Sequence, residues 1–344
     1  MKRTLALALT GMAVFAANFV VGAPVRADDF KLAMVIKSTT NPYYNATLAG
    51  AKMAAEEIGG SVENDGPTQS SATAQVDIIN NLADRHISAI AVAPSDPDAV
   101  APAMKRAQKL GVKVITFDAD SAADARPFHV NMATTDSVGR FGAKRLAQEL
   151  GNKGKVAIVS AQATAANQNA WIKAFRDELK KPEYAGIEVV DEVYGNDNEQ
   201  QAFDATVALT TKYPDLAGIY APTCPGLPAV ARALESVDKG GGKIKLAGMC
   251  VPSITSKYML DGTIQVFYLW DPVKLGYVTF YAAKLLSEGK LKGEPGETFT
   301  IPEGRKWPGT YTIIPDLGHQ IVTGGPLEYT KDNYKEHNLS LIHI

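Results

Sequence analysis

The sequence lacks the motifs that usually mark catalytic centres. It contains no HExxH, GxSxG or CxxC segment, so nucleophilic and metal catalysis lack their usual parts. GNKGK from Gly151 and GGGK from Gly240 resemble phosphate loops, but each precedes a predicted strand instead of following one. Apart from His343 near the end, the histidines fall away from the carboxyl ends of the predicted strands: His86, His129, His319 and His337. We therefore expect a protein that is not an enzyme and binds no metal or cofactor.

Basic runs and a strong net charge are also missing. The 344 residues include 35 Lys and Arg and 37 Asp and Glu, which gives a formal net charge of −2. This balance argues against nucleic acid as a partner. A hydrophobic share of 46% with 21% charged residues is typical of globular proteins, and the length allows two domains of ordinary size.

A long apolar run occurs only at the N-terminus. Lys2 and Arg3 precede the apolar stretch 5–21, and Val25-Arg26-Ala27 provides a small-residue cleavage site. This layout predicts a secretory signal peptide over residues 1–27, with cleavage before Asp28, and a soluble exported protein. The alternative is a membrane anchor, since the run approaches spanning length, but a predicted strand follows it at once.

Cysteine is scarce, with only Cys224 and Cys250. An oxidising compartment would allow these two to pair, but the sequence leaves the pairing open. The last six residues, 339–344, resemble the translated end of a sequencing-library adapter, so we expect them to be foreign to the natural chain.

From Asp28 onward, short apolar strands alternate with amphipathic helices. The predicted strands LAMVIK, ISAIAVAP and VKVITFD are continuous apolar runs, which indicates burial on both faces and hence a parallel sheet. After FHVNM the alternation restarts, with KVAIVS, LAGIYAP and KIKLAGM as strands. The pattern predicts two successive doubly wound α/β lobes.

Polar and aromatic residues follow the predicted strands at their carboxyl ends, where open parallel sheets bind ligands. The candidate ligand-binding residues are Lys37, Asn41, Tyr43, Tyr44, Asp118, Asn167, Gln168, Trp171, Pro222, Cys224, Met249, Trp270 and Asp271. Carboxylates and amides bond neighbouring hydroxyls, and aromatic rings cover C–H faces, so this set predicts a site for a neutral sugar.

Several of these residues have structural alternatives. Tyr43, Tyr44 and Trp171 could simply pack their helices. Asn167 could be a helix N-cap. Asp120, two residues after Asp118, could cap the following loop. A lysine that ends a buried strand, as Lys37 does, needs a partner or a ligand.

The chain resembles the ribose-type periplasmic sugar-binding proteins of bacterial ABC importers. "NPYY" after the first strand and "LWDPVKLG" near the end carry this resemblance, which spans residues 28 to about 338. "DGPT", "SAQATAANQNAWI", "YAPT" and "YLWDP" are most similar to the rhamnose-binding proteins and to receptors for the quorum signal autoinducer-2.

The autoinducer-2 receptors hold their ligand with a set of residues that this chain matches in part. Lys37, Asp118, Gln168 and Pro222 stand at matching positions. Asn167 replaces an aspartate of that set, and Cys224 replaces an alanine. The resemblance therefore implies a rhamnose-like deoxyhexose or related monosaccharide rather than autoinducer-2.

The resemblance also implies an arrangement and a partner. Residues 28–131 and 272–300 would form the N-terminal lobe, and 132–271 and 301–338 the C-terminal lobe. Three hinge strands would join the lobes, which would close on the sugar. A monomer would then deliver the sugar from the periplasm to an ABC transporter permease. The alternative is a sensing module, for autoinducer-2 or another ligand, that reports to a chemoreceptor or a sensor kinase.

Overall fold

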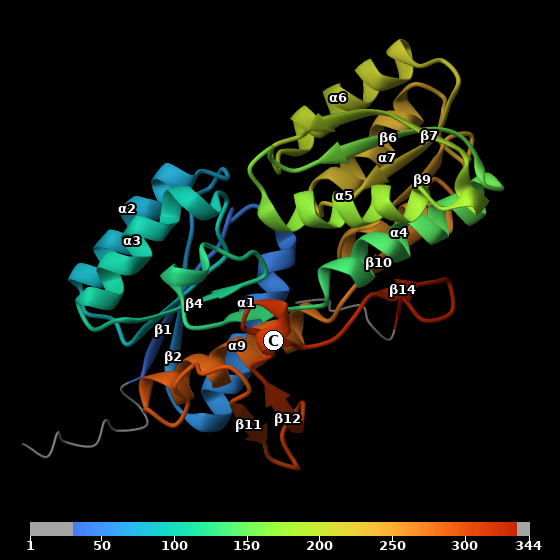
Figure 1. Ribbon diagram of the computed structural model, residues 1–344. Coiled ribbons are helices and arrows are strands. Elements are labelled where there is room, and N and C mark those ends of the chain that lie inside the picture. The colour runs from blue at the N-terminus through green and yellow to red at the C-terminus, as the bar shows by residue number, and fades with distance from the viewer. Residues whose placement is uncertain (1–29, 336–344) are drawn as a thin grey trace, which may run out of the picture.

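The computed structural model describes residues 30–335, which form two lobes (Figure 1). The expected signal peptide over residues 1–27 and the segment 339–344 lie outside the described residues. Within residues 30–335, no helix combines the length and the apolar composition that crossing a membrane requires.

A six-stranded parallel sheet forms the core of the first lobe. Its strand order is β13-β5-β4-β3-β1-β2. Every residue of β3 is buried, as the continuous apolar run predicts for a strand covered on both faces. Before the chain first crosses to the second lobe, it forms these elements of the first lobe: β1 (Lys31–Val35), α1 (Pro42–Ile58), β2 (Ser61–Asp65), α2 (Ala72–Asp84), β3 (Ala89–Val92), α3 (Pro97–Lys109), β4 (Lys113–Phe117) and β5 (His129–Asn131).

The second lobe repeats this design with the strand order β14-β10-β9-β8-β6-β7. Its strands are parallel except β14 (Leu327–Tyr329), which pairs antiparallel with β10. The other elements are α4 (Thr135–Leu150), β6 (Lys153–Ser160), α5 (Ala166–Leu179), β7 (Gly186–Tyr194), α6 (Glu199–Lys212), β8 (Leu216–Ala221), α7 (Gly226–Ser236), β9 (Lys245–Met249), α8 (Pro252–Leu260) and β10 (Val266–Leu269). The predicted pair of doubly wound lobes is confirmed.

Helix α9 (Pro272–Ser287) returns the chain to the first lobe, where it packs along α1 (Figure 1). Two glycines allow this close approach. A Cβ atom on Gly50 would lie 1.8 Å from the Val273 carbonyl oxygen, and one on Gly276 would lie 1.7 Å from that of Thr47. Any side chain at either position would therefore force the two helices apart.

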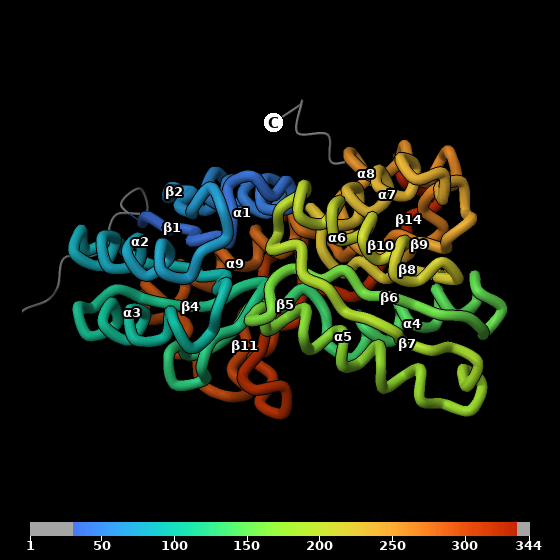
Figure 2. Tube along the Cα trace, turned by 90° about the horizontal axis from the view of Figure 1, so that it is seen from above, coloured from blue at the N-terminus to red at the C-terminus, as the bar shows by residue number. Residues whose placement is uncertain are grey.

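The chain passes between the lobes three times, at 132–134, 270–271 and 323–326 (Figure 2). The third passage corrects the predicted lobe boundary, which assigned all of 301–338 to the second lobe. Strand β13 (Gln320–Val322) pairs with β5 in the first sheet. The hairpin of β11 (Thr298–Ile301) and β12 (Gly309–Thr312) precedes it. The error arose because a three-residue strand carries too little periodicity to be assigned from sequence.

Candidate functional site

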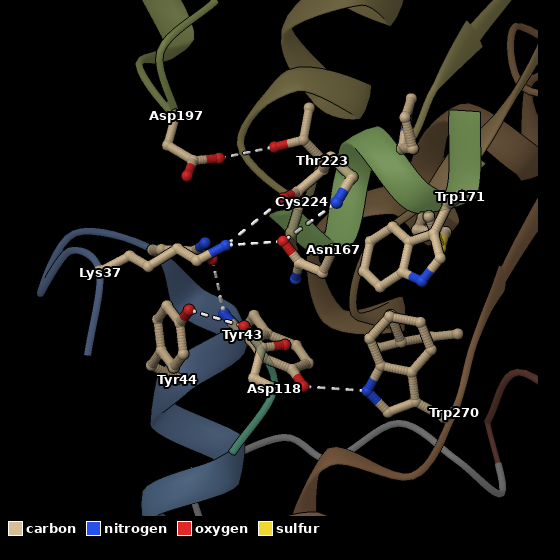
Figure 3. A pocket seen from close by; sticks show the side chains of 15 residues that line it. Lys37, Tyr43, Tyr44, Asp118, Asn167, Trp171, Asp197, Thr223, Cys224 and Trp270 are labelled. Carbon is tan, nitrogen blue, oxygen red and sulfur yellow. Dashed lines mark hydrogen bonds between the residues drawn. The ribbon is translucent and has the colours of Figure 1, made fainter. Parts of the chain in front are cut away.

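A cavity lies between the lobes, at the carboxyl ends of the strands of both sheets (Figure 3). Every predicted ligand-binding residue lines it except Asp271. The lining residues are Lys37, Asn41, Tyr43, Tyr44, Asp118, Asn167, Gln168, Trp171, Asp197, Pro222, Thr223, Cys224, Met249, Leu269 and Trp270.

Lys37 links the two lobes across the cavity. Its side chain, 2% exposed, donates hydrogen bonds to Asn167 Oδ1 at 2.9 Å and to Gln168 Oε1 at 3.3 Å. Both acceptors are neutral amides, so they solvate the ammonium without neutralising it. An ammonium has three N–H donors, and the contacts within residues 30–335 use two of them. The remaining donor is suited to a ligand oxygen.

Asp118 supplies a buried carboxylate directly after β4. Its backbone adopts the left-handed conformation, with φ 61°, which aspartate tolerates better than most residues. Tyr44 Oη donates to Asp118 Oδ2 at 3.0 Å. Burial raises the pKa of the Asp118 carboxyl, and the nearby Lys37 and Tyr44 oppose that shift in part. A carboxylate offers about four acceptor positions, so Asp118 retains capacity for ligand hydroxyls.

Aromatic rings form one side of the cavity. Trp270 Nε1 donates to Tyr43 Oη at 2.9 Å, and the two rings meet edge to face. The Trp171 and Trp270 ring centroids lie 5.4 Å apart. Burial, helped by the Asp118 charge, raises the pKa of both Tyr43 and Tyr44 well above the ordinary value, so both phenols stay protonated. These aromatic residues therefore pack the core and also line the cavity. A packing role and a ligand-binding role are thus compatible for each of them.

The asparagines at the two helix starts have different roles. Asn41 is the N-cap of α1, where it accepts from the Tyr43 N–H, and it also lines the cavity. Asn167 lies inside α5, whose N-cap is Ala165. The Asn167 Oδ1 accepts from Lys37 and from the Gln168 N–H. The interpretation of Asn167 as a helix cap is therefore wrong.

Two aspartates that follow predicted strands, Asp271 and Asp120, lie outside this cavity. Asp271 is exposed and caps α9, accepting from the Lys274 N–H at 2.9 Å, so its prediction as a lining residue was wrong. Asp120 pairs with the buried Arg126 and accepts from Thr116. It lines a neighbouring pocket instead.

The sequence prediction missed three lining residues: Asp197, Thr223 and Leu269. Asp197 accepts a hydrogen bond from Thr223 Oγ1 at 2.7 Å. It lies in the loop after β7, at the carboxyl end of a strand, but the candidate residues were not drawn from this loop. Thr223 and Leu269 are direct neighbours of residues that were chosen.

The two cysteines form a disulfide, which the sequence left open. Cys224 lines the cavity and Cys250 is fully buried. Among residues 30–335, no group of three or more His, Cys, Asp or Glu side chains is placed to hold a metal ion.

The cavity is lined by both hydrogen-bonding groups and apolar surface. Hydrogen-bonding groups come from Lys37, Asn41, Asp118, Asn167, Gln168, Asp197 and Thr223. Apolar surface comes from Trp171, Pro222, Cys224, Met249, Leu269 and Trp270. Such a cavity suits a small molecule with hydroxyls on one part and C–H surface on another.

Comparison with known proteins gives a consistent family. Residues 32–291 match the family described as periplasmic binding protein domain. A solute-binding protein of an ABC transporter from Clostridium phytofermentas, with bound L-rhamnose, is 30% identical with a TM-score of 0.85. The alignment covers 90% of this chain and 98% of that one.

Two further solved structures are similar. A sugar ABC transporter protein from Actinomyces odontolyticus is 39% identical with a TM-score of 0.70, and 90% of this chain and 98% of that one are covered. LsrB from Clostridium saccharobutylicum in complex with AI-2 is 23% identical with a TM-score of 0.83, over 89% and 99% of the two chains. At that identity, the last likeness shows the fold alone.

Proposed function

Because the chain belongs to the family of periplasmic binding proteins, we propose that it captures a small neutral sugar between its lobes and delivers it to an ABC transporter permease. The cavity between the lobes, lined by hydrogen-bonding groups and by apolar and aromatic surface, is the main support for this proposal. The protein acts as a monomer in the periplasm after removal of residues 1–27, and it catalyses no reaction.

The hydrogen-bonding groups of the cavity account for hydroxyl binding. Asp118 accepts from hydroxyls of the sugar, while the third N–H of Lys37 donates to a sugar oxygen. Gln168 and Asn167 approach from the other lobe. A sugar that contacts residues of both lobes would hold the lobes together. Sugar binding would therefore favour the closed arrangement of the lobes.

The apolar lining residues favour a deoxyhexose such as L-rhamnose. A methyl group next to Cys224, Met249 and Leu269 loses no hydrogen bond on burial, whereas the hydroxymethyl group of an ordinary hexose would leave a hydroxyl without a partner. The structural relative with bound L-rhamnose supports the same ligand class.

Autoinducer-2 is the second candidate ligand, because Lys37, Asp118, Gln168 and Pro222 all line the cavity. In that case the protein would be a receptor that also feeds a chemoreceptor or a sensor kinase. The neutral Asn167 opposes this alternative. Its amide oxygen is already bonded to Lys37, and its N–H₂ group cannot accept from a hydroxyl as a carboxylate would.

A thermal-shift screen of the purified protein tests the proposal. The panel contains L-rhamnose, its 6-hydroxy counterpart L-mannose, and autoinducer-2. A ligand that binds only the folded state at a hundred times its Kd stabilises the fold by about 2.7 kcal/mol. We expect L-rhamnose to raise the melting temperature more than either competitor. A shift with autoinducer-2 alone would replace the sugar proposal with the receptor alternative.

A further inference from the structure

The Cys224–Cys250 disulfide lies in the wall of the cavity. It joins the loop after β8 to the loop after β9. Cys224 lines the cavity, and so does Met249, the residue before Cys250. The bond therefore connects two segments that both contact the ligand space.

The two strands approach each other closely where these loops begin. Ala221 and Gly248 are register partners in the parallel pair of β8 and β9. A Cβ atom on Gly248 would lie 2.3 Å from the Ala221 carbonyl oxygen. The missing side chain lets both loops leave the sheet side by side, and the disulfide then fixes their separation.

A third loop depends on the same connection. Thr223, next to Cys224, donates its hydroxyl to Asp197 Oδ1 at 2.7 Å. Asp197 itself adopts a left-handed backbone, with φ 52°, in the loop after β7. One covalent bond and one hydrogen bond thus connect the loops that follow β7, β8 and β9 of the second sheet, and all three loops line the cavity.

We propose that the Cys224–Cys250 disulfide is a positioning element of the sugar site. It holds the wall of Pro222, Thr223 and Cys224 in the shape that the sugar meets. Without the bond, the fold of the lobe persists but the wall must be ordered when the sugar binds, which lowers the affinity. Only the expected change in sugar affinity rests on the proposed function; the ordering of the wall does not.

The test compares the full chain with the double variant C224A/C250A. The control is Leu246→Ala, which removes a buried side chain from β9 outside the cavity lining and lowers stability without touching the wall. Hydrogen–deuterium exchange without sugar is followed in peptides covering 219–227 and 247–253. Calorimetry then gives the Kd for L-rhamnose.

We expect faster exchange in these two peptides of C224A/C250A, and a Kd for L-rhamnose raised about tenfold. Leu246→Ala should leave the Kd unchanged. Wild-type protein reduced with dithiothreitol should show the same loss, and re-oxidation should restore the affinity.

Unchanged exchange and affinity in C224A/C250A would overturn the inference. An equal loss of affinity in Leu246→Ala would also overturn it, because the effect would then reflect stability alone. If L-rhamnose does not bind the wild type, L-rhamnose is contradicted as the ligand. The exchange comparison needs no sugar, so faster exchange confined to the two peptides would still support the positioning role.

Discussion

Replacement of Asp118 by alanine should remove most of the sugar affinity. The carboxylate is 5% exposed and lines the cavity, so water would not replace the lost bonds once the sugar is enclosed. A hydrogen bond to a charged group contributes about 1.5–3 kcal/mol. Two bonds to neighbouring hydroxyls therefore amount to about 3–6 kcal/mol, or at least a hundredfold in Kd. Calorimetric titration of L-rhamnose measures this loss.

Asp271→Ala is the matched control for this experiment. It removes an aspartate that the sequence also predicted for the site, but whose side chain is exposed and caps α9. We expect a stability loss of about 1 kcal/mol from the missing cap and no change in affinity. An unchanged Kd in folded Asp118→Ala would refute the assignment of Asp118 to the sugar.

The raised pKa of Asp118 predicts that removing its charge increases the stability of the sugar-free protein, although it weakens sugar binding. Because burial raises this pKa in the folded state, the ionised carboxylate opposes folding. The contribution of Asp118 to stability falls as the pH rises from the ordinary aspartate pKa, about 3.9, through the raised value. At pH 7 and without sugar, Asp118→Asn should therefore raise the melting temperature while it lowers the affinity. If Asp118→Asn loses both stability and affinity, the ionised Asp118 carboxylate does not oppose folding, and this argument is contradicted.

Three further predictions concern the other walls and the packing of the first lobe. Adding L-rhamnose should change the tryptophan fluorescence of the wild type, and Trp270→Phe should reduce that change; an identical response would place the sugar away from the ring. Asn167→Asp should improve the affinity for autoinducer-2 relative to L-rhamnose in parallel titrations, since a carboxylate restores an acceptor; equal affinities before and after would mean that Asn167 does not contact the ligand. Gly50→Ala should lower the free energy of unfolding by about 1–3 kcal/mol, because its Cβ would meet the Val273 carbonyl, and the Kd should stay the same; unchanged thermal unfolding would contradict the packing of α1 on α9.

The sequence predicted most of the site because one rule governs it. Parallel strands present their carboxyl ends at one edge, so residues that follow different strands, such as Lys37 and Asp118, converge without any knowledge of the packing. The apolar runs were long enough to locate these strands. The periodicity of the helices then fixed the order of the elements in both lobes.

The errors occurred where short-range signals compete. Asp271 follows a strand, as a ligand-binding residue would, but it also precedes a proline at the start of a helix, and the capping role prevailed. Asp197 was missed because two consecutive left-handed residues, Asn196 and Asp197, turn the chain back toward the cavity, and periodicity does not report such a turn. The disulfide depends on the adjacency of β8 and β9, which only the fold determines.

The central claim is that one small neutral sugar binds between the lobes, in contact with both. Calorimetric titration of L-rhamnose into the wild type, Asp118→Ala and Gln168→Ala tests it most directly, because these two residues line the cavity from opposite lobes. We expect one sugar per chain in the wild type and weakened binding in both variants. Wild-type binding that neither variant alters would place the sugar outside this cavity and contradict the proposed site.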